Sequence, residues 1–216
     1  MTEKFHAELN DLKTDVADMA HFALAMLRDA LESFINQNEG QASTVLERKD
    51  HLRETGVRLE EHCYQLIALN QPMAKDMRTI ACSLKVISAS DRIGRYGKST
   101  AKIVKEISRK PHIANMMSLP LMSEYVISMI EDATTAYDTE NIQMLKDFSA
   151  RDDAIDALRH SIFREAITYM MENPKTITQA TYYIIIARYL ERCADHACKI
   201  AENVCYMETG ERVEIK

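Results

Sequence analysis

Apolar residues recur along the chain with the spacing of α-helices that pack on neighbouring helices. In the first such stripe the steps alternate between four and three residues, which keeps the apolar side chains on one face of a helix. The stripe consists of Phe5, Leu9, Leu12, Val16, Met19, Ala23, Met26 and Ala30. No stretch alternates in the manner of a β-strand, so the pattern predicts an all-α protein.

Five further stripes follow, separated by segments that break helices. We expect breaks near Gly40, Pro72, residues 111–120, Asn141 and Pro174. Pro72 suits the first turn of the third helix, which should reach about Ile107. The sixth helix should end near Met207 and fray beyond it. The sequence therefore predicts six helices.

The order of helices and breaks repeats along the chain. Asp50 lies 22 residues before Pro72, and Asp152 lies 22 residues before Pro174. In each half the helix after the proline carries an acidic residue followed by arginine, at Asp91–Arg92 and Glu191–Arg192. This duplication predicts two tandem three-helix bundles, residues 1–110 and 115–209, each long enough to bury a core.

Composition agrees with a globular protein of the reducing cytoplasm. The chain has 216 residues, of which 46% are hydrophobic, and a formal charge of -6, which argues against sequence-independent binding of nucleic acid by the whole surface. No apolar stretch approaches the length of a membrane-spanning helix and no signal sequence is visible. The five cysteines are odd in number, so we expect reduced thiols.

Four carboxylates are predicted to meet on the fifth and sixth helices. Helices joined by a short turn lie antiparallel, so residues at equal distance from the turn lie side by side. Counted from the turn at Pro174, Asp152 pairs with Asp195 and Asp156 pairs with Glu191. Such oxygen-rich clusters are typical of sites for hard cations, such as Fe(III), Mn, Mg or Ca, rather than zinc.

The alternative is an ordinary solvated surface. Glu191 and Asp195 point away from the apolar stripe of the sixth helix, and Arg188 and Arg192 lie close enough along that helix to pair with them. The carboxylates are then only ion-paired. In the first half, the same count pairs Asp50 with Arg95 and Glu54 with Asp91. An arginine there replaces one acid, which favours an ion pair over a metal.

Three segments carry a resemblance to a known family. They are "NQPMAKDMR" at the turn before the third helix, "SDRIGRYGKSTAKI" within it, and "YLERCADHACKIAENV" in the sixth. With the two three-helix repeats, these segments resemble the PhoU proteins over nearly the whole chain. The acidic residue followed four positions later by aspartate, as at Glu191 and Asp195, is similar to the family pattern, which implies a metal ion, iron among the candidates. In the first repeat the chain departs from it, because Arg95 stands where the family commonly has aspartate.

The third helix also carries a basic run at its end. We expect Arg92, Arg95, Lys98 and Lys102 to form a strip that docks an acidic partner surface or anionic head groups. The alternative is that these cations complement the helix dipole and keep the face solvated.

Other chemistry has little support. Cys193 belongs to the apolar stripe, so Cys193, His196 and Cys198 do not predict a zinc site. One Glu-x-x-His motif, Glu3 to His6, is too few for a di-iron oxidase, and no glycine-rich phosphate loop or nucleophile motif is present. The sequence thus predicts no catalytic residue.

The resemblance implies a non-enzymatic, cytoplasmic regulator of phosphate uptake. PhoU-like proteins are expected to form homodimers and to repress a phosphate ABC transporter through its ATPase and, where one exists, a phosphate-sensing histidine kinase. They reach the membrane only through these partners and bind no nucleic acid directly. Two alternatives stay open: a metal-dependent enzyme that uses the four carboxylates on a phosphorylated substrate, and a helical assembly protein without metal.

Overall fold

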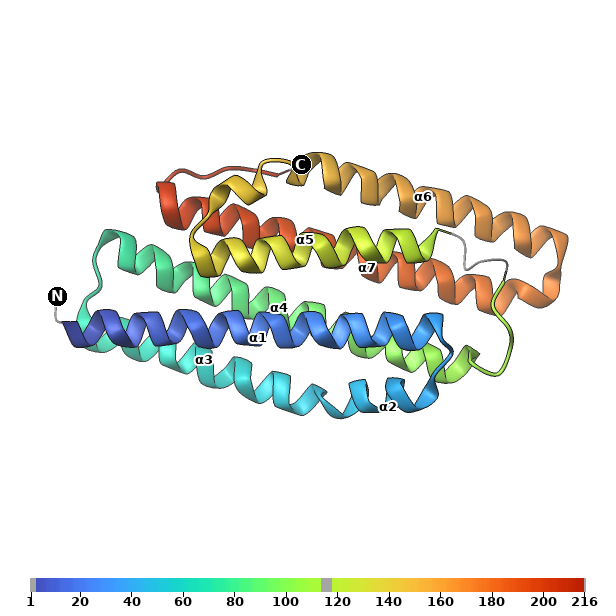
Figure 1. Cartoon of the computed structure of the whole chain (residues 1–216), viewed down its shortest axis with the longest axis horizontal. Coiled ribbons are helices and arrows are strands. Elements are labelled where there is room, and N and C mark those ends of the chain that lie inside the picture. Colours follow the sequence, from blue (N-terminus) through green and yellow to red (C-terminus); the bar gives the residue numbers. More distant parts are fainter. Residues whose placement is uncertain (1–2, 114–117, 216) are drawn as a thin grey trace.

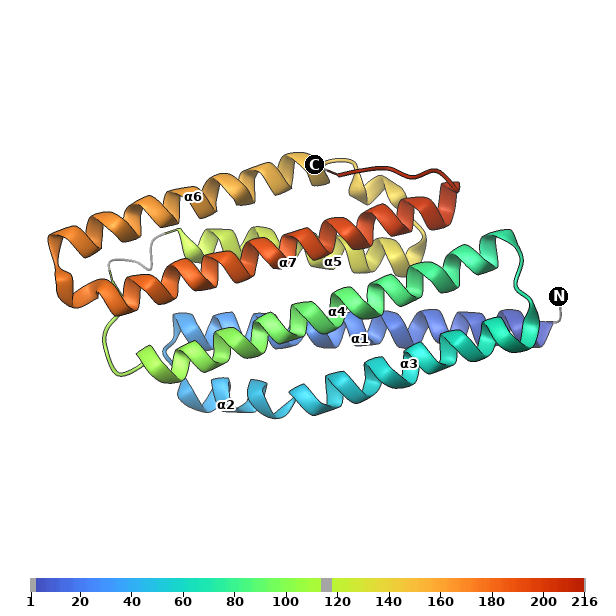
Figure 2. The ribbon, with the colours of Figure 1, turned by 180° about the vertical axis from the view of Figure 1, so that it is seen from behind.

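The computed structural model describes residues 3–113 and 118–215 and consists of long α-helices arranged in two groups (Figures 1 and 2). The elements are α1 (Glu3–Ile35), α2 (Glu39–Glu47), α3 (Lys49–Asn70), α4 (Ala74–Ile107), α5 (Leu119–Thr139), the 3-10 turn η2 (Ile142–Leu145), α6 (Phe148–Glu172), the 3-10 turn η3 (Pro174–Thr176) and α7 (Ile177–Thr209). The described residues contain no strand. The predictions of an all-α fold and of six helical rods are confirmed, with α2 and α3 forming the second rod.

The breaks lie close to the predicted positions but not always on the predicted residues. The first is made by Gln37, which adopts a left-handed φ of 50°, and by Asn38, whose side chain caps α2; Gly40 lies inside that helix. At the next break Gln71 ends α3 in a left-handed conformation and α4 begins at Ala74. Pro72 therefore precedes the helix instead of forming its first turn.

The two groups repeat one structural unit. We call α1–α4 repeat one and α5–α7 repeat two. Asp29 pairs with Arg48 across α1 and the α2–α3 junction, and Asp132 pairs with Arg151 across α5 and α6, at 2.5 and 2.7 Å and with the same separation of 19 residues. Left-handed Gln37 and Glu140, followed by asparagine caps, also correspond.

These features fix which residues are equivalent. Positions in α1 to α3 correspond to positions 103 residues later, as Arg28 does to Glu131, and these two side chains form an ion pair across the repeats. Positions in α4 correspond to positions 100 residues later, since Gly97, Ala101 and Val104 of the packed face match buried Ala197, Ala201 and Val204. The alignment by Asp50 and Asp152 was wrong by one residue: Lys49 is the equivalent of Asp152.

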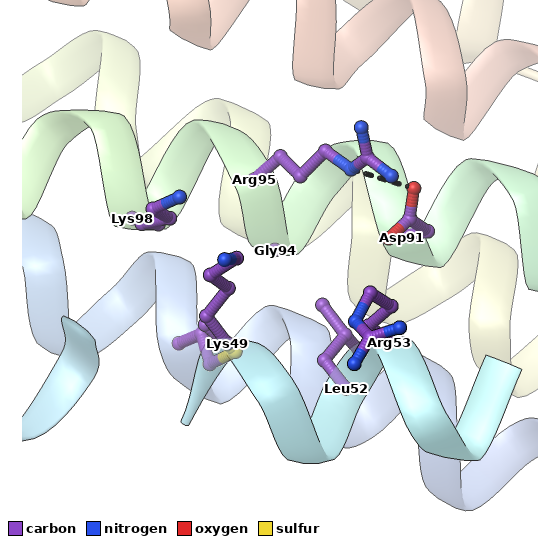
Figure 3. A pocket seen from close by; sticks show the side chains of 8 residues that line it. Lys49, Leu52, Arg53, Asp91, Gly94, Arg95 and Lys98 are labelled. Carbon is purple, nitrogen blue, oxygen red and sulfur yellow. Dashed lines mark ion pairs between the residues drawn. The ribbon is translucent and has the colours of Figure 1, made fainter. Parts of the chain in front are cut away.

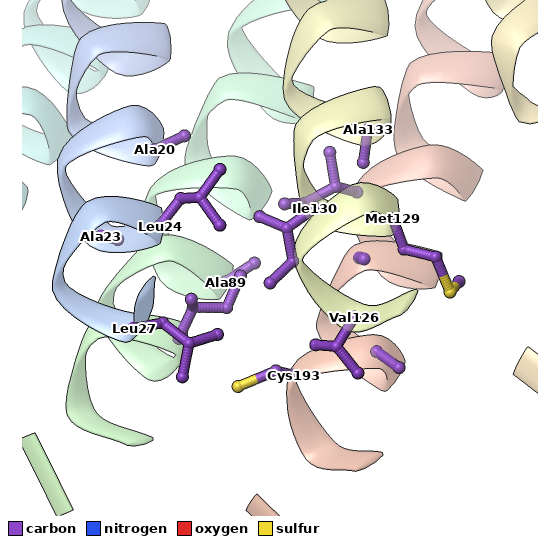
Figure 4. Close-up of a cluster of buried hydrophobic side chains, with 14 of the residues drawn as sticks. Ala20, Ala23, Leu24, Leu27, Ala89, Val126, Met129, Ile130, Ala133 and Cys193 are labelled. Carbon is purple, nitrogen blue, oxygen red and sulfur yellow. The ribbon is translucent and has the colours of Figure 1, made fainter. Parts of the chain in front are cut away.

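The repeats pack through α1 and α4 of one and α5 and α7 of the other. Figure 4 shows Leu24 of α1 and Ile130 of α5 pointing toward each other, with Ala89 of α4 and Cys193 in the same buried cluster. α4 approaches α1 closely at Gly97, where an added Cβ would lie 2.9 Å from the backbone nitrogen of Leu27. This shared core makes both repeats parts of one packed unit.

The segment after α7 does not fray as the sequence predicted. Gly210, with a left-handed φ, closes α7, and the following segment turns back along repeat two until the Ile215 nitrogen donates a hydrogen bond to Glu202 Oε1 at 2.9 Å. The predicted linker between the bundles lies partly at residues 114–117, outside the described residues. No helix in the described part of the chain is both long and apolar enough to cross a membrane.

Candidate functional site

Three of the four predicted carboxylates, Asp152, Asp156 and Asp195, lie near one another on the α6–α7 hairpin; we call them the acidic face. Asp152 and Asp195 line a surface depression of about 260 Å³ together with Cys198 and Glu202. Burial raises the pKa of Asp152, and the charges of Asp195 and Asp156 raise it further. The structure therefore brings Asp195 and Asp156 close enough to Asp152 to repel its carboxylate.

Glu191 does not face its predicted partner. Its carboxylate is paired with Arg188 on its own helix and with Arg159 of α6, whose Nε lies 3.6 Å away. The 3-10 turn at Pro174–Thr176 lengthens the connection, so that Arg159 takes the position opposite Glu191 that the count from the turn gave to Asp156. Asp195 is likewise paired, with Arg192 at 2.8 Å.

These arginines neutralise part of the carboxylate charge on the hairpin. Among the residues that the structure describes, no three His, Cys, Asp or Glu side chains are placed to hold a metal ion. The arrangement present is a partly neutralised carboxylate surface. A cation would fit only if Glu191 and Asp195 exchanged their arginine partners for it.

The predicted basic strip is divided between two sides of α4. Arg92 faces α7, where its charge adds to the burial that lowers the pKa of His196 to about 4. Lys98 faces α3, where desolvation and the charge of Lys49 lower its pKa. Lys102 is exposed, and Arg95 pairs with Asp91 of its own helix at 2.8 Å.

The ion pair expected in repeat one is present with different partners. Arg95 binds Asp91 instead of Asp50, and Asp50 and Glu54 lie 3.6 Å from their neighbours Lys49 and Arg53. Between α3 and α4 these cations line a pocket of about 290 Å³ (Figure 3). We call it the repeat-one pocket, and its charged lining is Lys49, Arg53, Asp91, Arg95 and Lys98.

Sequence reasoning missed Lys49 and Arg53 as members of a site. The core positions could have identified them, because buried Leu52 and Leu59 of α3 correspond to buried Ile155 and Ile162 of α6. In that register Lys49 and Arg53 occupy the places of Asp152 and Asp156. The repeat-one pocket and the acidic face are thus equivalent locations.

Comparison with known proteins assigns the chain to a family. The model of the PhoU domain matches residues 16–104 and again residues 119–204. The chain belongs to the PhoU family. Each matched stretch falls within one of the two repeats, in agreement with the resemblance read from the sequence.

Similarity to individual PhoU proteins extends over nearly the whole chain. It is 29% identical over 217 residues to a phosphate-specific transport system accessory protein PhoU homolog of Clostridium acetobutylicum, covering 100% of this chain and 99% of that one. A protein of the same description from Rhizobium meliloti is 31% identical, with 95% and 87% covered. The crystal structure of PhoU from Pseudomonas aeruginosa has a TM-score of 0.92 at 27% identity, covering 96% of this chain and 100% of that one.

Proposed function

We propose that this protein regulates phosphate uptake as a cytoplasmic, non-enzymatic accessory protein of a phosphate ABC transporter. It would repress transport by binding the transporter's ATPase and would act on a phosphate-sensing histidine kinase where one exists. Membership of the PhoU family over both repeats carries this proposal, because the relatives from C. acetobutylicum and R. meliloti are named accessory proteins of the phosphate-specific transport system.

Physically, such a protein acts as a binding scaffold. Long helices joined by one continuous core present rigid faces to partners, and exposed Arg92 and Lys102 provide positive charge for docking an acidic surface of the ATPase. The protein would reach the membrane through that partner, as a homodimer, and would not bind nucleic acid directly. The names of the relatives favour this regulator over a metal-dependent enzyme.

A hard cation at the acidic face, iron foremost, is a separate proposal. Its support is the repulsion among Asp152, Asp156 and Asp195, which a cation would relieve. Elemental analysis and thermal melts with added metal test it, using the wild type and the Asp152→Asn, Asp195→Asn variant. Equal metal content and equal melting of the two proteins under all conditions would end this proposal.

The regulatory function is tested by phosphate uptake in cells. Loss of the protein should raise uptake of labelled orthophosphate when external phosphate is plentiful, and the wild-type chain should restore repression. A variant with Arg92→Glu and Lys102→Glu should restore it less well and should bind the purified ATPase more slowly, with a weaker dependence on salt. Uptake that does not respond to loss of the protein contradicts the proposed function.

A further inference from the structure

The repeat-one pocket is shaped by α3 and α4. Buried Leu52 and Met26 form its apolar floor, and the charged side chains stand around the rim (Figure 3). Gly94 contributes to the floor by having no side chain, since a Cβ there would lie 2.2 Å from Leu52 Cδ2. At about 290 Å³ the pocket lies at the small end of the range of ligand sites, which suits a small ion rather than a cofactor.

Its charges are largely uncompensated. Among the described residues Lys98 has neither an ion pair nor a hydrogen-bond partner. Lys49 and Arg53 have only exposed carboxylates at 3.6 Å, next to them in sequence, and such surface pairs contribute little. Arg95 and Asp91 neutralise each other. Three cations therefore surround the pocket, and only the exposed carboxylates of Asp50 and Glu54 balance them in part.

The titration of Lys98 reflects this imbalance. Desolvation lowers its pKa, and the neighbouring charges of Lys49, Lys102 and Arg95 lower it further, whereas the carboxylate of Asp50 opposes the shift without cancelling it. A bound anion would remove that repulsion, just as a cation would at the acidic face. The two equivalent locations thus favour ligands of opposite charge.

We propose that the repeat-one pocket binds one free monohydrogen phosphate ion, held by Lys49, Arg53 and Lys98. Arginine and lysine donors form short charge-assisted hydrogen bonds with oxyanions, and three of them around a small pocket match a tetrahedral dianion. That the ion is phosphate rests on the proposed function, which this inference deepens: the regulator would sense the ion whose uptake it controls. That the pocket takes an anion rests on its geometry alone.

Asp91 supplies a basis for selectivity. It is the one carboxylate in the lining, and one of its oxygens is engaged by Arg95. The other oxygen is available to accept a hydrogen bond from the P–OH group of orthophosphate. Sulfate and the dianion of a phosphate monoester carry no such proton near neutral pH, so they would meet an unpaired and repelling carboxylate. A site built to bind a ligand's O–H group discriminates strongly against analogues that lack it.

The test is calorimetric titration of the full chain, treated with chelator to remove metals, with orthophosphate, sulfate and glycerol 3-phosphate at constant ionic strength. We expect one phosphate ion per chain. The pocket variant, Lys98→Gln with Arg53→Gln, should bind it at least about 10-fold more weakly, because two charge-assisted hydrogen bonds are lost. The control, Lys85→Gln with Lys105→Gln, removes the same charge from exposed positions of α4 outside the pocket. It should differ from the wild type by no more than about twofold.

Selectivity is tested with Asp91→Asn. This variant should bind sulfate nearly as well as phosphate, whereas the wild type should prefer phosphate by about 10-fold or more. Absence of saturable phosphate binding, an equal loss in the control variant, or wild-type binding of sulfate or glycerol 3-phosphate as tight as that of phosphate would each overturn the inference. Phosphate binding without any effect of the protein on cellular uptake would instead refute the proposed function alone.

Discussion

In repeat one, α3 and α4 bring Lys49, Arg53 and Lys98 around a pocket, whereas in repeat two α6 and α7 bring Asp152, Asp156 and Asp195 to the equivalent place. The buried residues beneath the two places correspond one to one, and the acid at the start of each motif is retained as Asp91 and Glu191. The core of a three-helix unit therefore fixes where such a site lies, and the exposed positions above it decide the charge of its ligand.

The largest effect is expected when the charge difference between the two sites is removed by giving repeat one the residue that repeat two has at the equivalent position, Asp195. Arg95→Asp places a second carboxylate one turn from Asp91 and removes the cation that neutralises it. We expect phosphate affinity to fall by about 100-fold or more, because the charge of the lining changes by two units and two carboxylates then repel the dianion. Calorimetry measures the effect. A loss of less than about threefold would show that the charge of the pocket does not control binding.

A second comparison concerns helix packing at Gly97 and its equivalent, Ala197. Gly97→Ala forces a methyl group against the backbone of Leu27, which cannot move as a side chain can. We expect it to lower the free energy of unfolding by about 1–3 kcal/mol. The converse change, Ala197→Gly, should cost about 1 kcal/mol through helix propensity. Urea unfolding measures both, and a Gly97→Ala protein as stable as the wild type would contradict the close packing of α1 on α4.

The ion pairs shared by the repeats offer a smaller contrast. Arg151 contacts Asp132 at 2.7 Å, Ser128 at 2.9 Å and the ring of Phe148, and its side chain is 15% exposed, against 32% for Arg48. Replacing Arg151 with Met should therefore destabilise the protein by about 1–2 kcal/mol, and the same change at Arg48 by less than about 1 kcal/mol. The order of the two losses in urea unfolding is the decisive result.

The smallest effects concern the ligand-free protein. Asp152→Asn and Lys98→Gln should each stabilise it by a few tenths of a kcal/mol, roughly the size of surface repulsions. The pH dependence should have opposite signs. Since the pKa of Asp152 is raised, its unfavourable contribution disappears as the pH falls through that pKa; since the pKa of Lys98 is lowered, its contribution disappears as the pH rises through it. Thermal melts across pH check both signs, and the same sign at the two sites would be inconsistent with opposite charge imbalances.

The sequence predicted the helices well because breakers are few and the apolar stripes are long. The breaks at Pro72 and Pro174 were anticipated, but not the left-handed Gln71 or the 3-10 turn that follows Asn173. Backbone conformations of this kind have no strong signal in the residues that adopt them.

The candidate sites were predicted less well, for a geometric reason. Counting from a turn assumes a connection of fixed length, and the 3-10 turn at Pro174–Thr176 moved Arg159 opposite Glu191. Aligning the repeats by Asp50 and Asp152 instead of by the core hid the equivalence of Lys49 and Asp152. Register read from buried residues such as Leu52 and Ile155 is more reliable, because a shift along a helix moves apolar side chains into solvent.

One measurement tests the central claim most directly: titration of chelator-treated protein with orthophosphate, comparing the pocket variant Lys98→Gln, Arg53→Gln with the acidic-face variant Asp152→Asn, Asp195→Asn. The account predicts that only the pocket variant loses phosphate, by about 10-fold or more, while the acidic-face variant binds as the wild type does or slightly better. If phosphate binding disappears with the chelator, or is lost in the acidic-face variant and kept in the pocket variant, the anion binds through repeat two and the proposed division of charge between the repeats is wrong.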